Sequence, residues 1–286
     1  MEQDSAADAD EAVEQAKAEL RAASYKGPDR VVPASELRAE LAGISRRSFS
    51  FPTGLDNLDA AIGNVESGEL IAIGGPTKNG KTLLAQTMTA NMAKAGTHCL
   101  WFTFEVPAKQ FLEQVPESVE FFLPKKLKPG DMEWLGARIL EAQVKHDTRV
   151  VFIDNLHHLL DFTRMRNVSL DIGSVVRALK RTAVNLNVAI LILCHSRKPD
   201  GEVQQVSEWD LRDSSFIPQE CDSTIMVQRK QKDDGSYGTD AIVKVCLHRR
   251  KGTMGQIIHV YRGKDGLLVE DSNYHKVKNH ELDLKP

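Results

Sequence analysis

Few features of this chain point to a membrane or to secretion. No apolar run among its 286 residues approaches the roughly 18 residues that a transmembrane helix needs. The N-terminus, Met1-Glu-Gln-Asp, is acidic where a signal peptide carries basic residues. These absences predict a cytoplasmic protein that has no membrane partner.

Cysteine is scarce, and neither sign of charge dominates. The cysteines lie far apart without any C-x-x-C pair, which predicts buried thiols rather than disulfides or a zinc site. The formal net charge of −3 excludes a generally basic nucleic-acid coat, so any nucleic acid must meet local basic loops. The four cysteines are Cys99, Cys194, Cys221 and Cys246.

The order of apolar and helix-like stretches predicts an α/β fold. Strand-like runs alternate with helices, which favours a mostly parallel sheet with helices on both faces. A basic, glycine-containing turn joins the last two runs and predicts antiparallel hairpins at the end. The predicted strands are Leu70–Ile73, Cys99–Phe104, Val150–Ile153, Val188–Cys194, Thr224–Val227, Ile242–Leu247 and Ile257–Val260. The predicted helices are Thr82–Ala95, Met132–Lys145 and Ile172–Leu186.

Composition divides the chain into four segments. Residues 1–24 are acidic and lack an apolar stripe, so a partly disordered tail is favoured over a docking helix. Residues 25–49 read as a linker with a short helix, Glu36–Ala42, which cannot be stable alone. Residues 50–270 hold the predicted α/β domain, and residues 271–286 form a charged tail.

One segment has the pattern of a phosphate-binding loop, G-x-x-x-x-G-K-[ST], between a predicted strand and a predicted helix. Its glycines let backbone N–H groups curl around phosphates at a helix N-terminus. Lys81 is expected to reach the β- and γ-phosphates of ATP, and the Thr82 hydroxyl to hold Mg²⁺. The predicted ATP-binding residues are Gly75, Pro76, Thr77, Lys78, Asn79, Gly80, Lys81 and Thr82.

Two carboxylates are candidates to complete this site. Asp154 ends an apolar strand, as needed to orient Mg²⁺ beside a phosphate loop. Glu105 closes the predicted strand Cys99–Phe104. It is either a general base for the attacking water or an N-cap or first-turn carboxylate of the helix after Pro107. The residue pattern alone leaves both roles of Glu105 open.

Further motifs occur in a distinctive order around the phosphate loop. Before it stand Thr53-Gly-Leu-Asp-Asn-Leu-Asp59 and Ser67-Gly-Glu-Leu70, and after it stands Phe102-Thr-Phe-Glu105. Then follow Arg177-Ala-Leu-Lys180, Asp210-Leu-Arg-Asp-Ser214 with Gln219 and Asp222, and His248-Arg-Arg-Lys-Gly252 with Gly255. Over about residues 50–270 the chain thereby resembles the ATPase domain of hexameric replicative helicases of the DnaB type.

The resemblance implies a RecA-like P-loop core that forms a ring, expected to be hexameric, with ATP between subunits. By the same resemblance, Glu105 is expected to be the catalytic base and Asp154 the Mg²⁺ partner. Arg250 is expected to be an arginine finger that reaches the neighbour's γ-phosphate. It also implies an ATP-dependent helicase on single-stranded DNA in replication, with a primase or loader protein as a further partner. The resemblance further implies the cytoplasm of a bacterial or phage-infected cell, and the short N-terminal segment suggests a phage-encoded member.

A second hypothesis from a different class is a RecA- or RadA-like recombination or regulatory ATPase that binds DNA without unwinding it. The D-L-R and hairpin motifs favour the helicase. Forked-duplex unwinding separates the two, because ATP hydrolysis without strand separation would favour the second.

The chain departs from the family pattern at three positions. His195 stands where the family has a glutamine that senses the γ-phosphate; a neutral imidazole can hydrogen-bond there, or His195 has no catalytic role. His248 replaces the lysine that accompanies the finger, which weakens the case for a second cation acting on the neighbour. Ser215 replaces a glycine.

The candidate DNA-binding residues lie in loops that leave the carboxyl ends of predicted strands, where open α/β folds carry function. In a ring such loops would contact the DNA backbone, giving salt-dependent binding, whereas scattered surface arginines are the alternative. The candidates are Arg164, Arg166, Arg197, Lys198, Arg212, Asp213 and Ser214.

Replacing Lys81 with alanine is expected to abolish ATP hydrolysis while the fold stays intact, because the phosphates lose their positive partner. A steady-state ATPase assay together with circular dichroism checks this. Retained turnover in a folded Lys81→Ala protein would remove Lys81 from the mechanism.

Overall fold

The structure, a computed structural model, describes residues 14–27, 29–43, 49–160, 168–196, 210–211, 215–231 and 237–271. The chain divides into two compact units, Met1–Arg47 and Ser48–Pro286. In the first unit residues 14–23 form an exposed helix, so the expected tail over residues 1–24 is helical in part. Helix α2 (Ala34–Gly43) contains the predicted helix Glu36–Ala42.

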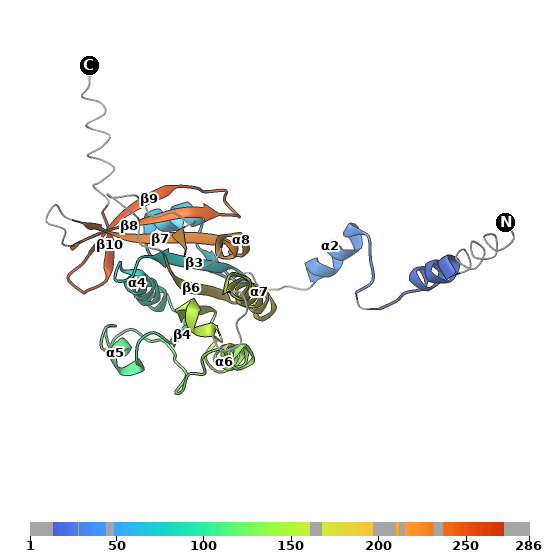
Figure 1. Cartoon of the computed structure of the whole chain (residues 1–286), viewed down its shortest axis with the longest axis horizontal. Coiled ribbons are helices and arrows are strands. Elements are labelled where there is room, and N and C mark those ends of the chain that lie inside the picture. Colours follow the sequence, from blue (N-terminus) through green and yellow to red (C-terminus); the bar gives the residue numbers. More distant parts are fainter. Residues whose placement is uncertain are drawn as a thin grey trace, which may run out of the picture. The chain divides into compact units, whose positions relative to one another are not determined.

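The second unit is built on one mixed sheet with the strand order β10-β9-β8-β7-β3-β6-β5-β4 in the described residues (Figure 1). Strands β7, β3, β6, β5 and β4 are parallel, whereas β8, β9 and β10 are antiparallel, as the sequence predicts. The strands are β3 (Leu70–Gly75), β4 (Cys99–Thr103), β5 (Val150–Asp154), β6 (Ala189–His195), β7 (Ser223–Gln231), β8 (Tyr237–His248), β9 (Gln256–Arg262) and β10 (Leu268–Glu270). A small separate sheet pairs β1 (Ser50–Phe51) with β2 (Val65–Glu66).

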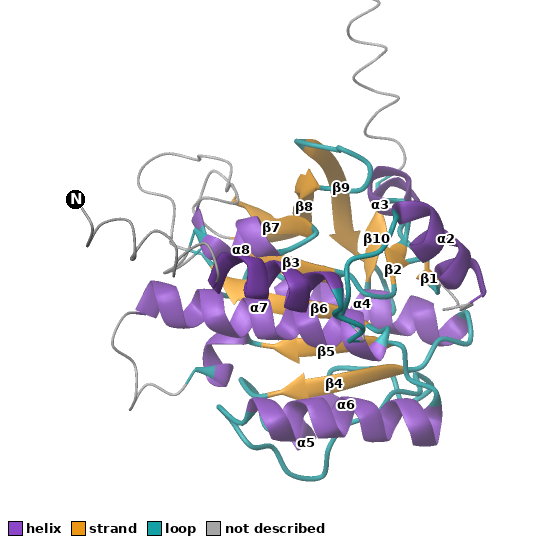
Figure 2. Ribbon diagram, turned by 90° about the vertical axis from the view of Figure 1, so that its right-hand side faces the viewer, coloured by secondary structure: helices purple, strands orange, loops and turns teal. Residues whose placement is uncertain are grey.

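Helices cover both faces of this sheet because its central strands are apolar on both sides. In β3, Ile71 and Ile73 belong to one apolar cluster, with α4, whereas Leu70 and Ala72 belong to the other, with α6 and α7. Figure 2 shows α6 alongside β4 and α7 lying over the parallel strands and running along them. The helices are α3 (Asp56–Ile62), α4 (Lys81–Lys94), α5 (Ala108–Leu112), α6 (Met132–His146), the 3₁₀ helix η1 (Leu156–Leu159), α7 (Val168–Leu186) and α8 (Phe216–Glu220).

The cysteines are buried free thiols, as predicted. Burial raises the pKa of Cys99 and of Cys194 to about 12, so both are uncharged and unreactive at neutral pH. Among the described residues, no helix combines the length and the apolar character required to cross a membrane.

Asp222 holds the beginning of β3, the strand that leads into the phosphate loop. Its Oδ2 accepts hydrogen bonds from Leu70 N at 2.7 Å and from Lys180 Nζ at 2.7 Å. Lys180 also donates to Gly68 O at 2.8 Å. One half-buried carboxylate therefore ties β3 to α7 and to the start of β7, which fixes where the phosphate loop begins.

Replacing Asp222 with alanine should lower the free energy of unfolding by about 2 kcal/mol, because Leu70 N–H and the Lys180 ammonium lose their acceptor. Urea denaturation measures this. Glu220→Ala is the matched control: its carboxylate pairs with half-exposed Arg177 at 3.3 Å, and its loss should cost less than about 1 kcal/mol. Equal losses in the two variants would contradict the assignment.

Candidate functional site

The phosphate loop joins β3 to α4, and its backbone requires glycine at two positions. A Cβ on Gly75 would collide with the carbonyl oxygen of Val227, and Gly80 has a φ of 96°, in the left-handed region. Lys81 is 6% exposed, and its Nζ donates to Gly75 O and to Pro76 O, both at 3.0 Å. Burial lowers the pKa of Lys81, although the charges of neighbouring carboxylates oppose this. The ammonium thus lies inside the loop, on carbonyls that phosphate oxygens can replace.

Strand register brings the two predicted carboxylates to the phosphate loop. Gly75 pairs with His195 across β3 and β6, and Thr103 pairs with Asp154 across β4 and β5. The Thr82 hydroxyl, in the first turn of α4, donates to Asp154 Oδ2 at 2.8 Å. The two residues predicted to hold Mg²⁺ are therefore in direct contact.

Asp154 fits a divalent cation. The residue is 2% exposed, and its Oδ1 has no hydrogen-bond partner among the described residues. Burial, followed by the charge of Glu105, raises the pKa of Asp154 to about 6, while the hydrogen bond from Thr82 lowers it. A buried carboxylate with an unpartnered oxygen is stabilised by a hard cation, and carboxylate and hydroxyl oxygens are ligands that Mg²⁺ accepts.

Glu105 and His195 meet through a residue that the sequence analysis missed. Asn155 Nδ2 donates to Glu105 Oε2 at 2.6 Å and lies 2.9 Å from His195 Nε2. His195 Nε2 is itself 3.5 Å from Glu105 Oε2. The alternative role of Glu105 in helix α5 is wrong, because the N-cap of that helix is Pro107 and its first turn contains no acidic residue. The only sequence signal for Asn155 is its place directly after Asp154.

A cleft of about 660 Å³ opens beside the phosphate loop. Lys81, Thr82, Glu105 and His195 line it together, so the structure gathers these predicted residues at one site. The cleft is also lined by residues at the end of β9 and in the β9–β10 turn that the sequence analysis did not single out, because only the folded sheet brings them to the loop. They are Arg262, Asp265 and Gly266.

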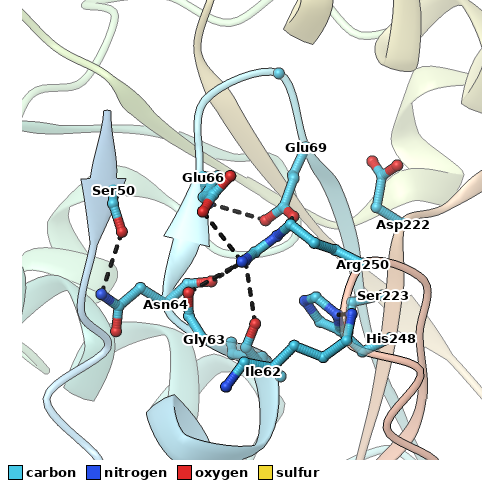
Figure 3. A network of polar contacts seen from close by, with 12 residues as sticks. Ser50, Ile62, Gly63, Asn64, Glu66, Glu69, Asp222, Ser223, His248 and Arg250 are labelled. Atoms are coloured by element: carbon cyan, nitrogen blue, oxygen red, sulfur yellow. Dashed lines mark hydrogen bonds and ion pairs between the residues drawn. The ribbon is translucent and has the colours of Figure 1, made fainter. Parts of the chain in front are cut away.

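Arg250 lies outside this cleft, in a polar network at the other end of β3 (Figure 3). Its guanidinium is 3.0 Å from Glu66 Oε1 and 3.2 Å from Glu69 Oε1. It also donates to the carbonyl oxygens of residues 62–64 at 3.1–3.2 Å. Since Glu69 precedes β3 and Gly75 ends it, about 20 Å of strand separates Arg250 from the phosphate loop of its own chain. Arg250 therefore cannot reach a phosphate bound in that loop.

His248, which stands in the place of a family lysine, is fully buried. Its Nδ1 accepts from Lys251 N at 3.2 Å. Burial, with the nearby charges of Arg250 and Lys251, lowers the pKa of His248. A neutral, enclosed imidazole cannot act as a second cation beside Arg250.

The predicted DNA-binding residues lie outside the described residues. The segments that carry them follow β5, follow β6 and precede α8 along the chain. Both β5 and β6 end at the edge of the sheet where the phosphate loop lies. The residues concerned are Arg164, Arg166, Arg197, Lys198, Arg212, Asp213 and Ser214.

Comparisons with known proteins agree with this geometry. The family model described as the DnaB-like helicase C-terminal domain matches residues 50–134 and 124–266. A solved structure described as an ATPase domain is 16% identical, with a TM-score of 0.70 over 83% of this chain and 97% of that chain. A solved structure of a DnaB-like replicative helicase, described together with its interactions with primase, is 16% identical, with a TM-score of 0.69 over 90% of this chain and 71% of that one. The comparison with curated proteins gives no match.

Asp154→Asn should change the free energy of unfolding and the rate of ATP hydrolysis in opposite directions. Because burial opposes the charge of Asp154, the neutral amide should raise the free energy of unfolding without metal or nucleotide by about 1 kcal/mol at neutral pH. The same change should lower Mg²⁺-dependent ATP turnover at least about 100-fold, since the amide is a poorer cation ligand. Urea denaturation and a Mg²⁺ titration of turnover measure the two effects. The control is Asp147→Asn, which changes an exposed carboxylate and should alter neither quantity. An unchanged Mg²⁺ dependence in Asp154→Asn would contradict the assignment of Asp154 as a Mg²⁺ ligand.

Proposed function

The chain belongs to the DnaB-like helicase C-terminal domain family and is an ATP-dependent replicative DNA helicase domain. From this premise we propose which residues bind ATP, hydrolyse it and bind DNA. We assign residues 50–270 as the motor, residues 1–24 and 271–286 as tails, and residues 25–49 as a linker. The motor acts as a ring, with six subunits as the expected number, and ATP binds between neighbours. The observation that carries this proposal is that the phosphate loop and Arg250 lie at opposite ends of β3.

In this proposal the phosphate loop, Gly75–Thr82, binds the triphosphate through its backbone N–H groups. Lys81 exchanges the carbonyl oxygens that it now contacts for the β- and γ-phosphates. Glu105 orients and activates the attacking water, and His195 hydrogen-bonds the γ-phosphate. Thr82 and Asp154 hold Mg²⁺, which when bound neutralises charge on the phosphate oxygens.

Arg250 supplies the remaining positive charge from the neighbouring subunit. A finger stabilises the charge that develops on the transferred phosphoryl group. The distance between Arg250 and its own phosphate loop supports action across the subunit boundary. In the structure the guanidinium binds Glu66 and Glu69, so the neighbour's phosphate must compete with these two carboxylates.

Single-stranded DNA binds the segments that follow β5 and β6 and the segment before α8, through Arg164, Arg166, Arg197, Lys198 and the residues 212–214. Contacts to the phosphate backbone give affinity that falls with salt and reads no sequence. Strands β5 and β6 end beside the ATP site. This supports a coupling between ATP hydrolysis and DNA binding, because a movement at the γ-phosphate would reach the segments that follow these strands.

A primase or a loader protein is the further partner that we propose. The similarity to a helicase whose structure is described with its interactions with primase supports a primase. The recombination or regulatory ATPase is the less favoured alternative, since the family match is to helicases. Unwinding of a forked duplex with ATP tests the proposal, and hydrolysis without strand separation would contradict it.

A mixing experiment tests the shared site. Arg250→Ala and Glu105→Gln should each reduce ATP turnover by at least about 10³-fold, since each removes one half of the site. In an equal mixture about a quarter of the subunit boundaries combine an intact Glu105 with an intact Arg250, so turnover should return to that fraction.

The matched control is Arg249→Ala, which removes the adjacent exposed arginine and should keep full turnover. Failure to recover turnover at any mixing ratio, in variants that still assemble, would show that Arg250 does not act on a neighbour.

A further inference from the structure

The side-chain amide of Asn155 joins two functional residues that come from different strands. Asn155 is 2% exposed, and its Nδ2 lies 2.6 Å from Glu105 Oε2 and 2.9 Å from His195 Nε2. An amide nitrogen carries two hydrogens, so it can donate one to each of these atoms at the same time.

Local structure fixes the orientation of this amide. Asn155 is the N-cap of η1, and its Oδ1 accepts a hydrogen bond from His157 N at 3.0 Å. With the oxygen used by the cap, the NH₂ group must point the other way, towards Glu105 and His195. A flipped amide would lose the cap and would place its oxygen against the Glu105 carboxylate.

The protonation of His195 follows from this orientation. The NH₂ group has no lone pair, so His195 Nε2 can only accept from it. An imidazole whose Nε2 accepts is neutral and carries its proton on Nδ1. A hydrogen on Nε2 would instead meet an N–H of Asn155, or would pair directly with Glu105 at 3.5 Å.

We propose that Asn155 is a positioning residue for ATP hydrolysis: it holds the Glu105 carboxylate in place and keeps His195 neutral with its proton on Nδ1. The proposal rests on the proposed roles of Glu105 and His195. A Glu105 carboxylate bound by an uncharged amide stays a better base than one paired with an imidazolium.

The first experiment measures the tautomer of His195 in the wild-type protein and needs no hydrolysis. Long-range ¹H–¹⁵N NMR at neutral pH reports which ring nitrogen carries the proton, and His195→Gln identifies the signal. The expected result is a protonated Nδ1 and an unprotonated Nε2. A proton on Nε2, alone or with Nδ1, would overturn the proposal.

The second experiment compares Asn155→Asp with Asn57→Asp. Asn57 Nδ2 donates to Glu270 Oε2 at 3.0 Å, and neither residue lines the cleft, so both changes set a carboxylate against a carboxylate. Asn155→Asp should lower kcat about 100-fold with nucleotide Kd changed less than about threefold, and Asn57→Asp should leave kcat unchanged.

Unchanged kcat in Asn155→Asp, or equal losses in the two variants, would overturn the proposal. If Asn155→Asp does not fold, the tautomer in the wild-type protein decides. A wild-type chain that assembles but hydrolyses no ATP would refute the proposed function, while the tautomer would still test the geometry around Asn155.

Discussion

The parallel register of β3, β6, β5 and β4 is the constraint on which the rest of the site depends. Gly75 pairs with His195 and Thr103 with Asp154, so four strands end at one edge with their functional residues side by side. A slip of one residue would turn every side chain of a strand to the opposite face. The buried apolar faces of these strands fix the register, and the core therefore determines where the phosphate loop, Asp154 and Glu105 meet.

The two ends of β3 have different roles. The carboxyl end forms the phosphate loop, whereas the amino end carries Glu69, which binds Arg250 together with Glu66. On the proposed mechanism, one chain holds both halves of a hydrolytic site but cannot bring them together. Identical chains related by a closed rotation would do so, with the Arg250 end of each chain facing the phosphate loop of the next. On this account Glu66 and Glu69 hold the arginine until the neighbour's phosphate displaces them.

The sequence predicts the central strands and the phosphate loop well, for physical reasons. Buried parallel strands are continuous apolar runs, and the spacing of Gly75, Gly80 and Lys81 has few other uses. Asn155 could not be predicted, because an asparagine after a strand reads as an ordinary cap and only the fold brings Glu105 and His195 to it. The partners of Arg250 were hidden too, since 181 residues separate it from Glu69. Where residues 14–23 form a helix, the sequence favoured a partly disordered tail, because the stretch lacks an apolar stripe.

The central claim is that hydrolysis requires a phosphate loop from one subunit and an arginine from the next. The most direct measurement is ATP turnover per chain across a dilution series, with light scattering on the same samples. The account predicts that turnover per chain falls with the assembled fraction and vanishes for the monomer. Full turnover per chain in samples that are entirely monomeric would contradict it.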